Sequence, residues 1–170
     1  EELVIDSRLI AKTSFQFIDE PLSTKNDWEI LKQEIANNII FLDLAQIEKI
    51  KTQEKIQIIL DHIYVQNDSP LECTKKCSKY IFDNFKYIKG ITTVETTIDQ
   101  ILEFRSGVCQ DFAHVLLQLL RTIGIPSRYC SGYICPNKNG MRGEGATHAW
   151  VEAYIPNLGW IGIDPTNNKQ

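Results

Sequence analysis

Residues 105–126 read RSGVCQDFAHVLLQLLRTIGIP, and this stretch decides the fold. A helix is predicted from Cys109 to Ile123, because Gly124 suits a C-terminal cap and Pro126 cannot continue a helix. Apolar side chains cover most of its circumference and leave one polar stripe, made of Asp111, His114, Gln118 and Arg121. A helix this apolar is expected at the centre of its domain.

Downstream of this helix, the sequence has the pattern of short strands. Strands are predicted at 128–135, 148–155 and 160–164. A Gly-rich loop at 136–145 separates the first two, and a tight turn at 156–159 joins the last two. The second half of the chain is therefore expected to form an antiparallel sheet.

Upstream, the helical spacing of apolar residues predicts helices over 27–38 and 44–62. The capping boxes SPLE and TIDQ begin further helices, over about 69–85 and about 97–104. A helical first half followed by an antiparallel second half predicts an α+β domain.

The length of 170 residues suits one domain whose core buries roughly 70% of the unfolded surface. Residues 70–170 are expected to form that core, and residues 1–69 a helical extension or linker packed on it. We expect the chain to be a fragment of a longer protein, because it starts with Glu1 rather than Met and ends just after an apolar stretch.

The composition excludes several functional classes. Apolar residues make up 43% of the chain and charged residues 24%, with a net charge of −4, which is typical of a globular domain. No block of Lys and Arg offers a footprint for nucleic acid, and no apolar stretch reaches the roughly 20 residues that span a membrane. Five cysteines, an odd number, do not suggest a disulfide framework. We therefore expect a reducing, cytoplasmic location and, by default, a monomer.

Cys109 occupies the first turn of the predicted central helix, directly after a turn that contains Gly107. The N-terminus of a helix has free backbone N–H groups and a positive potential. Both lower the pKa of a thiol and favour the thiolate, which is the nucleophilic form. The same N–H groups can stabilise an oxyanion that forms next to the sulfur.

A thiolate nucleophile requires a base with an orienting partner, and the last two strands offer one of each. His148 begins one strand, and Asp164 ends the next, 16 residues later. A hairpin that turns at 156–159 places these two residues symmetrically about position 156, so they are predicted to meet on one sheet. A carboxylate on one imidazole nitrogen fixes the tautomer and leaves the other nitrogen for Cys109.

Four sequence blocks stand out: RSGVCQDFA at 105–113, GIPSRY with GY at 124–133, THAWVE at 147–152, and GW with DPT at 159–166. Together they resemble the transglutaminase-like superfamily, and most closely its bacterial branch of transglutaminase-like proteins and candidate cysteine proteases. They follow the order of the family, and the resemblance extends over about residues 70–168.

The resemblance implies a papain-like core, in which a central helix carrying the nucleophile Cys109 packs on a sheet carrying His148 and Asp164. It implies thiol chemistry on amides, with no metal and no other cofactor. The main hypothesis is therefore a cysteine-dependent amide-bond hydrolase, a protease or amidase, whose substrate is a peptide or protein amide. In it Cys109 attacks the carbonyl, His148 takes the thiol proton and later protonates the leaving amine, and Asp164 orients His148.

Two further residues are candidates for the same site. Members of the family often use a side-chain oxyanion donor upstream of the cysteine, commonly Trp, but no Trp lies between Trp28 and Trp150. Tyr87 is the candidate donor in its place. Trp150, two residues past His148, is a candidate for lining the substrate cleft, and the 136–145 loop is expected to set side-chain selectivity.

Two alternatives to hydrolysis remain open. Transamidation of protein glutamine uses the same three residues, but no site for an acceptor amine can be recognised in the sequence, and the missing Trp argues against efficient transfer. A non-catalytic binding module would keep the fold without the chemistry. The presence of Cys109, His148 and Asp164 together argues against it.

Other polar residues have simpler interpretations. His114 lies about 140° around the helix from Cys109, so it is interpreted as structural. His62, near a helix end, is expected to be solvated. Asp111 and Arg128 are expected to form a salt bridge of the framework near the site.

The remaining cysteines could suggest a zinc site with four thiolates. Their spacing fits the usual pattern only loosely, and two of them point to opposite faces of a regular strand. We therefore expect no metal at Cys73, Cys77, Cys130 and Cys135.

Overall fold

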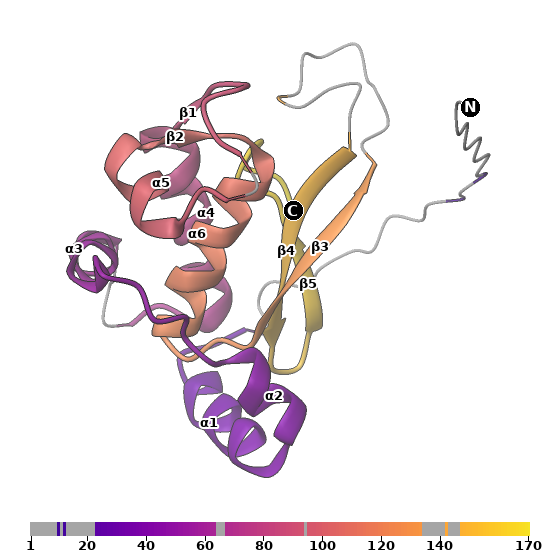
Figure 1. Ribbon diagram of the computed structural model, residues 1–170. Helices are drawn as coiled ribbons and strands as arrows, with labels where there is room; N and C mark the ends of the chain where they lie inside the picture. Colours follow the sequence, from indigo (N-terminus) through magenta and orange to yellow (C-terminus); the bar gives the residue numbers. More distant parts are fainter. Residues whose placement is uncertain are drawn as a thin grey trace.

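The computed structural model describes residues 10, 12, 23–63, 67–93, 95–133, 142 and 147–170. Among the described residues, six helices lie between residues 27 and 122 and the three strands of the main sheet follow them, which confirms the predicted α+β class (Figure 1). In chain order the elements are α1 (Asp27–Asn37), α2 (Ile39–Leu44), α3 (Gln53–Ile63), α4 (Pro70–Asn84), β1 (Lys86–Tyr87), α5 (Ile98–Phe104), β2 (Ser106–Gly107), α6 (Cys109–Thr122), β3 (Ser127–Tyr133), β4 (Thr147–Ile155) and β5 (Gly159–Ile163).

Three antiparallel strands form the sheet, in the order β3–β4–β5. Gly132 of β3 lies opposite His148 of β4, and Val151 of β4 lies opposite Ile163 of β5. These strands confirm the three predicted from the sequence. A short parallel pair, β1 with β2, was not predicted, and it lies at the start of α6.

The helix α6 is the centre of the core, as its sequence predicts. Figure 1 shows α4, α5 and α6 gathered on one side of the sheet. Apolar side chains of α6 and of the inward face of β4 belong to one buried cluster, among them Phe112, Val115, Leu116, Leu119, Ala149, Val151, Ala153 and Ile155.

Both predicted capping boxes are confirmed. At the start of α4, Ser69 N–H donates to the Glu72 carboxylate at 2.7 Å, and Glu72 N–H donates to the Ser69 hydroxyl at 3.3 Å. Thr97 and Gln100 form the same reciprocal pair at the start of α5. Local sequence therefore fixes where these two helices begin.

The predicted helix over 44–62 is confirmed only from residue 53 onward, and its first part is wrong. The chain instead forms two helices, α2 and α3, separated by the irregular residues 45–52. The N–H and the hydroxyl of Thr52 each donate to the carboxylate of Asp99, on α5, at 2.7 Å. Because this partner is remote in sequence, the spacing of local apolar residues cannot reveal the break.

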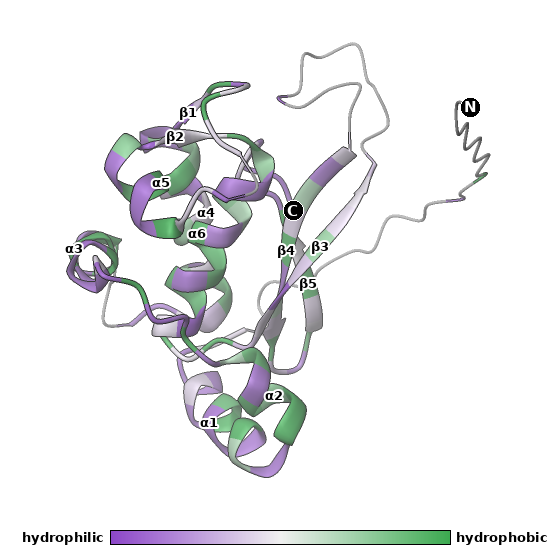
Figure 2. Ribbon diagram, viewed as in Figure 1, coloured by the Kyte–Doolittle hydropathy of each residue, from purple (hydrophilic) through white to green (hydrophobic). Residues whose placement is uncertain are grey.

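The N-terminal helices contribute to the same core as α6. Leu31 of α1 and Ile56 of α3 are buried members of its cluster. By contrast, α2 is coloured as largely apolar in Figure 2, yet its Ile39 is 80% exposed. Division of the chain at residue 70 stays a prediction. No described helix is long and apolar enough to cross a membrane.

Candidate active site

Cys109 is the first residue of α6, and it is half-buried. The preceding residue, Val108, is extended and serves as the N-cap. Its N–H donates to the carboxylate of Asp111 at 2.7 Å, which closes the first turn of the helix. Gly107 is required here, because a Cβ at this position would lie 2.5 Å from Asp111 Oδ2.

Asp111 is buried beneath this turn and has a second partner, the hydroxyl of Thr92, at 2.6 Å. The expected salt bridge between Asp111 and Arg128 is not formed. Arg128 instead donates to Glu152 at 2.7 Å, across the strand pair β3–β4. Asp111 ties the loop before α5 to the helix start that carries Cys109, which makes it part of the framework of the site.

His148 and Asp164 meet, with Nε2 and Oδ2 at 2.9 Å. Their register differs from the symmetric pairing that the sequence predicts. Continuing the observed pairing of Val151 with Ile163 places Asp164 opposite Trp150, so His148 is its diagonal neighbour. The side chains still meet because diagonal neighbours on one face of a sheet are within reach of long side chains. His148 is 2% exposed and Asp164 14%.

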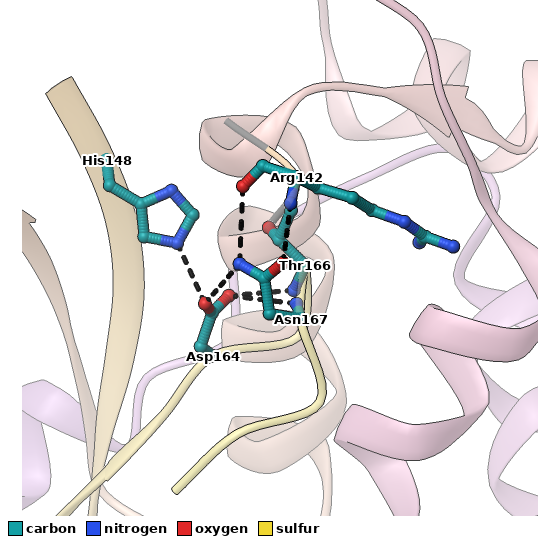
Figure 3. Close-up of polar contacts among 5 residues, drawn as sticks. All are labelled: Arg142, His148, Asp164, Thr166 and Asn167. Carbon is teal, nitrogen blue, oxygen red and sulfur yellow. Dashed lines mark hydrogen bonds and ion pairs between the residues drawn. The ribbon is translucent and has the colours of Figure 1, made fainter. Parts of the chain in front are cut away.

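The segment after β5 fixes the Asp164 carboxylate, as Figure 3 shows. Oδ1 accepts from the Thr166 N–H at 2.9 Å, and Oδ2 accepts from the Asn167 side-chain amide at 2.8 Å. Asn167 Oδ1 in turn accepts from the N–H of Arg142 at 2.8 Å. Sequence reasoning missed Asn167, although Asp164-Pro165-Thr166 has the pattern of an Asx turn, in which an Asp accepts from the N–H two residues on.

Mutual interactions hold the three predicted catalytic residues in a charged state. Burial opposes ionisation of Cys109, but the His148 ring and the backbone N–H groups of Ala149 and Gln110 outweigh it and lower the pKa of Cys109. Burial opposes protonation of His148, but Asp164 and Cys109 raise the pKa of His148 to about 9. Burial raises the pKa of Asp164, but the bond from His148 lowers it below its usual range. The shifts of Cys109 and His148 both favour a thiolate beside an imidazolium.

The second ring nitrogen of His148, Nδ1, is buried and has no hydrogen-bond partner among the described residues. The His148 side chain is nevertheless close enough to Cys109 for each group to shift the pKa of the other. Loose contacts of this kind are common in sites without substrate and tighten when substrate binds.

Two tyrosines lie near the thiol. Tyr87, the predicted oxyanion donor, pairs with Gly107 across β1 and β2. Burial, and then the negative charges of Cys109 and Asp111, raise its pKa, and the same causes raise the pKa of Tyr129 on β3. The role of Tyr87 stays a prediction. Sequence reasoning assigned no role to Tyr129, since its place beside α6 depends on the packing of β3.

Trp150 lies beside the histidine. Its indole is nearly parallel to the imidazole of His148, with ring centroids 6.5 Å apart and planes inclined by 20°. Its contact with substrate stays a prediction. The 136–145 loop lies outside the described residues, except for Arg142.

The other candidate residues lie apart from this centre. His114 is exposed and stacks on Tyr129 at 5.2 Å, and His62 is exposed near the end of α3. Within the described part of the chain, no cluster of His, Cys, Asp and Glu could hold a metal ion. Cys135 falls outside that part.

Comparison with known families places these residues in context. The family model described as the transglutaminase-like superfamily matches residues 59–165. An uncharacterized protein of Mycobacterium tuberculosis is 37% identical over 107 residues, which cover 58% of this chain and 34% of that protein. A protein-glutamine gamma-glutamyltransferase of Pseudomonas aeruginosa is 37% identical over 73 residues, which cover 40% of this chain and 11% of that protein. The matched region thus spans about a third of the mycobacterial relative.

Solved structures share the fold. A candidate cysteine protease from Cytophaga hutchinsonii superposes with a TM-score of 0.61 and 26% identity, covering 74% of this chain and 42% of that chain. The periplasmic domain of TgpA from Pseudomonas aeruginosa gives a TM-score of 0.59 and 25% identity, covering 76% of this chain and 47% of that chain. The fold of these structures is the one that the sequence blocks imply.

Proposed function

The chain belongs to the transglutaminase-like superfamily, and on that premise we propose that it is a cysteine-dependent hydrolase of peptide or protein amides. One observation carries the proposal. His148 bonds Asp164 Oδ2 through Nε2 at 2.9 Å, which leaves Nδ1 as the free ring nitrogen, and the same side chain lowers the pKa of Cys109. This is the arrangement that an activated nucleophile needs, namely a base that is itself oriented by a third group.

The proposed reaction begins from the thiolate of Cys109 and the imidazolium of His148. The sulfur attacks the amide carbonyl carbon, and the C=O electron pair moves to the oxygen. As the C–N bond breaks, His148 Nδ1 gives its proton to the leaving amine, and a thioester forms on Cys109. Water then attacks the thioester while Nδ1 takes a proton from it. Cleavage of the C–S bond releases the carboxylic acid and restores the pair.

The oxyanion of the tetrahedral intermediate would form at the N-terminus of α6. Backbone N–H groups in the first turn of a helix have no carbonyl of that helix as partner, so the N–H of Cys109 is suitably placed to donate. Tyr87 is proposed as the side-chain donor. Its support is its pairing with Gly107 and its electrostatic interaction with Cys109.

The test is the rate of alkylation of Cys109 by iodoacetamide against pH, with the labelled cysteine identified by peptide mapping. We expect rapid labelling well below the pH at which an ordinary thiol reacts, and a changed profile in His148→Ala. Wild type and Cys109→Ala are then compared on a panel of peptides and amides. A Cys109 that reacts only near pH 8.5, like a free thiol, or equal turnover by both proteins, would exclude the proposed hydrolase and favour a binding module.

A second candidate function is transamidation, in which an amine replaces water in the last step. It is favoured by the similarity to the Pseudomonas aeruginosa protein-glutamine gamma-glutamyltransferase. The two functions are separated by mass spectrometry of a glutamine peptide incubated with a primary amine. Deamidated product alone supports hydrolysis, and an amine adduct that depends on Cys109 supports transamidation.

A further inference from the structure

The indole of Trp150 lies flat across all three strands of the sheet. A Cβ on Gly132, in β3, would lie 2.8 Å from Cη2 of Trp150, and a Cβ on Gly162, in β5, would lie 3.9 Å from Cδ1 and Nε1. The two ends of one indole ring therefore rest on glycines of the two strands that flank its own. Neither glycine has a positive φ, so the backbone does not require glycine at either position.

The end of the indole that rests on Gly132 is the end next to His148. Gly132 pairs directly with His148 across β3 and β4. The indole and imidazole planes are inclined by only 20°, with centroids 6.5 Å apart, which is an offset stack. Trp150 thus covers one side of the histidine.

We propose that Trp150 is a positioning residue, which holds the imidazole of His148 in the plane where Nε2 bonds Asp164 and Nδ1 faces the nucleophile, and that Gly132 is required to make room for the indole. This role rests on the proposed function of Cys109 and His148. A single hydrogen bond at Nε2 leaves the imidazole free to tilt, and a ring stacked against it removes that freedom.

A tilt of the His148 imidazole would affect the charged groups that interact with it. The charged groups that act on it are Asp164, at the end of β5, and Cys109, on α6. The Arg128–Glu152 pair lies further along the same face of β4, with the guanidinium over Trp160 rather than Trp150. A tilt of the imidazole would therefore weaken its interactions with Asp164 and Cys109 and reduce the thiolate fraction of Cys109.

The two glycines provide a matched pair of variants. Gly132→Ala places a methyl group 2.8 Å from the indole and must displace it, whereas Gly162→Ala places the same group at ordinary van der Waals distance from the same ring. The readout is the rate of Cys109 alkylation at about pH 6, with melting temperature as a check on folding. We expect about tenfold slower alkylation in Gly132→Ala, the effect of raising the thiol pKa by one pH unit, and no change in Gly162→Ala.

Trp150→Phe tests the same role without adding bulk to the sheet, and it decides the matter if Gly132→Ala does not fold. A phenyl ring lacks the far end of the indole, which rests on Gly132 next to His148, so alkylation should slow as in Gly132→Ala. A spectroscopic readout accompanies it. Because imidazolium quenches a stacked indole, emission of the wild type should rise as His148 loses its proton, and this rise should be absent from His148→Asn and Trp150→Phe.

The outcomes separate the two proposals. A wild-type Cys109 that reacts like a free thiol overturns the proposed function itself. A reactive wild-type Cys109 that Gly132→Ala and Trp150→Phe leave unchanged overturns only the role of Trp150. Equal slowing by Gly132→Ala and Gly162→Ala also overturns it, because the effect would then not depend on displacing the indole.

Discussion

Gln118, on α6, holds both backbone groups of Glu48, a residue 70 positions earlier in the chain. Its Oε1 accepts from the Glu48 N–H at 3.2 Å, and its Nε2 donates to the Glu48 carbonyl at 2.9 Å. Gln118 is 2% exposed, so this amide is a buried polar group on the central helix of the core. The central helix thereby fixes the irregular segment between α2 and α3.

Replacing this amide should destabilise the fold without touching the site. Gln118→Leu keeps the size of the side chain but leaves both backbone groups of Glu48 without their partner. We expect a loss of about 1–2 kcal/mol in the free energy of unfolding, measured by urea denaturation. The control is Gln57→Leu, at an exposed position on α3, which should change stability by less than about 0.5 kcal/mol. Equal effects of the two variants would contradict this role for Gln118.

The contact between Gln118 and Glu48 also explains why the break between α2 and α3 could not be predicted from the sequence. The helices that begin at capping boxes, and α6 with its Gly124 terminus, could be predicted because local residues specify their ends. The break at 45–52 could not, because the groups that satisfy its backbone are side chains of Gln118 and Asp99. Such contacts exist only after distant parts of the chain have packed.

In the candidate site, the contact between His148 and Asp164 could be predicted because the two residues lie on strands joined by a tight turn. The hairpin between β4 and β5 brings His148 to Asp164 even though the register differs from the symmetric one. The neighbours of these residues were harder to predict. Gly132 leaves room for Trp150, and Tyr129 lies close enough to Cys109 and Asp111 for their charges to raise its pKa. Both contacts depend on how β3 packs in the sheet and against α6, and no local sequence pattern encodes that packing.

Asp164 should control the titration of His148. In wild type, Asp164 and Cys109 raise the pKa of His148 to about 9, against the ordinary 6.5. Asp164→Asn removes the negative charge and should lower the midpoint of the His148 titration toward 6.5. The measurement is a ¹⁵N NMR titration of the imidazole, with the resonance assigned by its loss in His148→Asn. An unchanged midpoint in Asp164→Asn would mean that the observed bond does not set the protonation state.

Protonation of His148 should make the free energy of unfolding depend on pH, and ionisation of Cys109 should partly cancel that dependence. The folded-state pKa of His148 is raised, so its contribution to stability is complete below about pH 6.5 and is lost as the pH rises through about 9. The folded-state pKa of Cys109 lies below the ordinary 9.0, so its contribution is complete above pH 9 and is lost as the pH falls through the folded-state value. Between the folded-state pKa of Cys109 and about pH 9, a rise in pH therefore reduces the stabilisation by His148 and increases the stabilisation by Cys109.

Cys109→Ala should therefore expose the slope of His148. Without Cys109 the folded-state pKa of His148 should lie below the value of about 9 in wild type, because Asp164 alone remains to raise it. We expect the free energy of unfolding of this variant to fall as the pH rises from about 6.5 to that lower pKa, while that of wild type changes less. Urea denaturation at several pH values measures both curves. Parallel curves would show that ionisation of Cys109 is not linked to folding.

Asp111 should stabilise the start of α6 through its charge. It accepts from the Val108 N–H at 2.7 Å and from the Thr92 hydroxyl at 2.6 Å while buried. Asp111→Asn replaces a charged acceptor with a neutral amide oxygen, which weakens both bonds, so we expect a loss of about 1–2 kcal/mol in unfolding free energy. Thr92→Val removes only the second bond and should cost less. If Thr92→Val lowers the unfolding free energy as much as Asp111→Asn does, the stabilisation comes from the bond between Asp111 and Thr92 rather than from the bond between Asp111 and Val108.

The buried cysteines of α4 should resist the reagent that labels Cys109. Burial raises the pKa of Cys73 to about 11 and that of Cys77 to about 12. Both thiols are therefore protonated and inaccessible near neutral pH, whereas Cys109 is half-buried with a lowered pKa. We expect mass spectrometry after brief exposure to iodoacetamide to find Cys109 labelled and Cys73 and Cys77 unlabelled, and all three labelled in denaturant. Native labelling of Cys73 at the rate of Cys109 would mean that α4 opens readily, since a buried thiol reacts only when the structure around it exposes it.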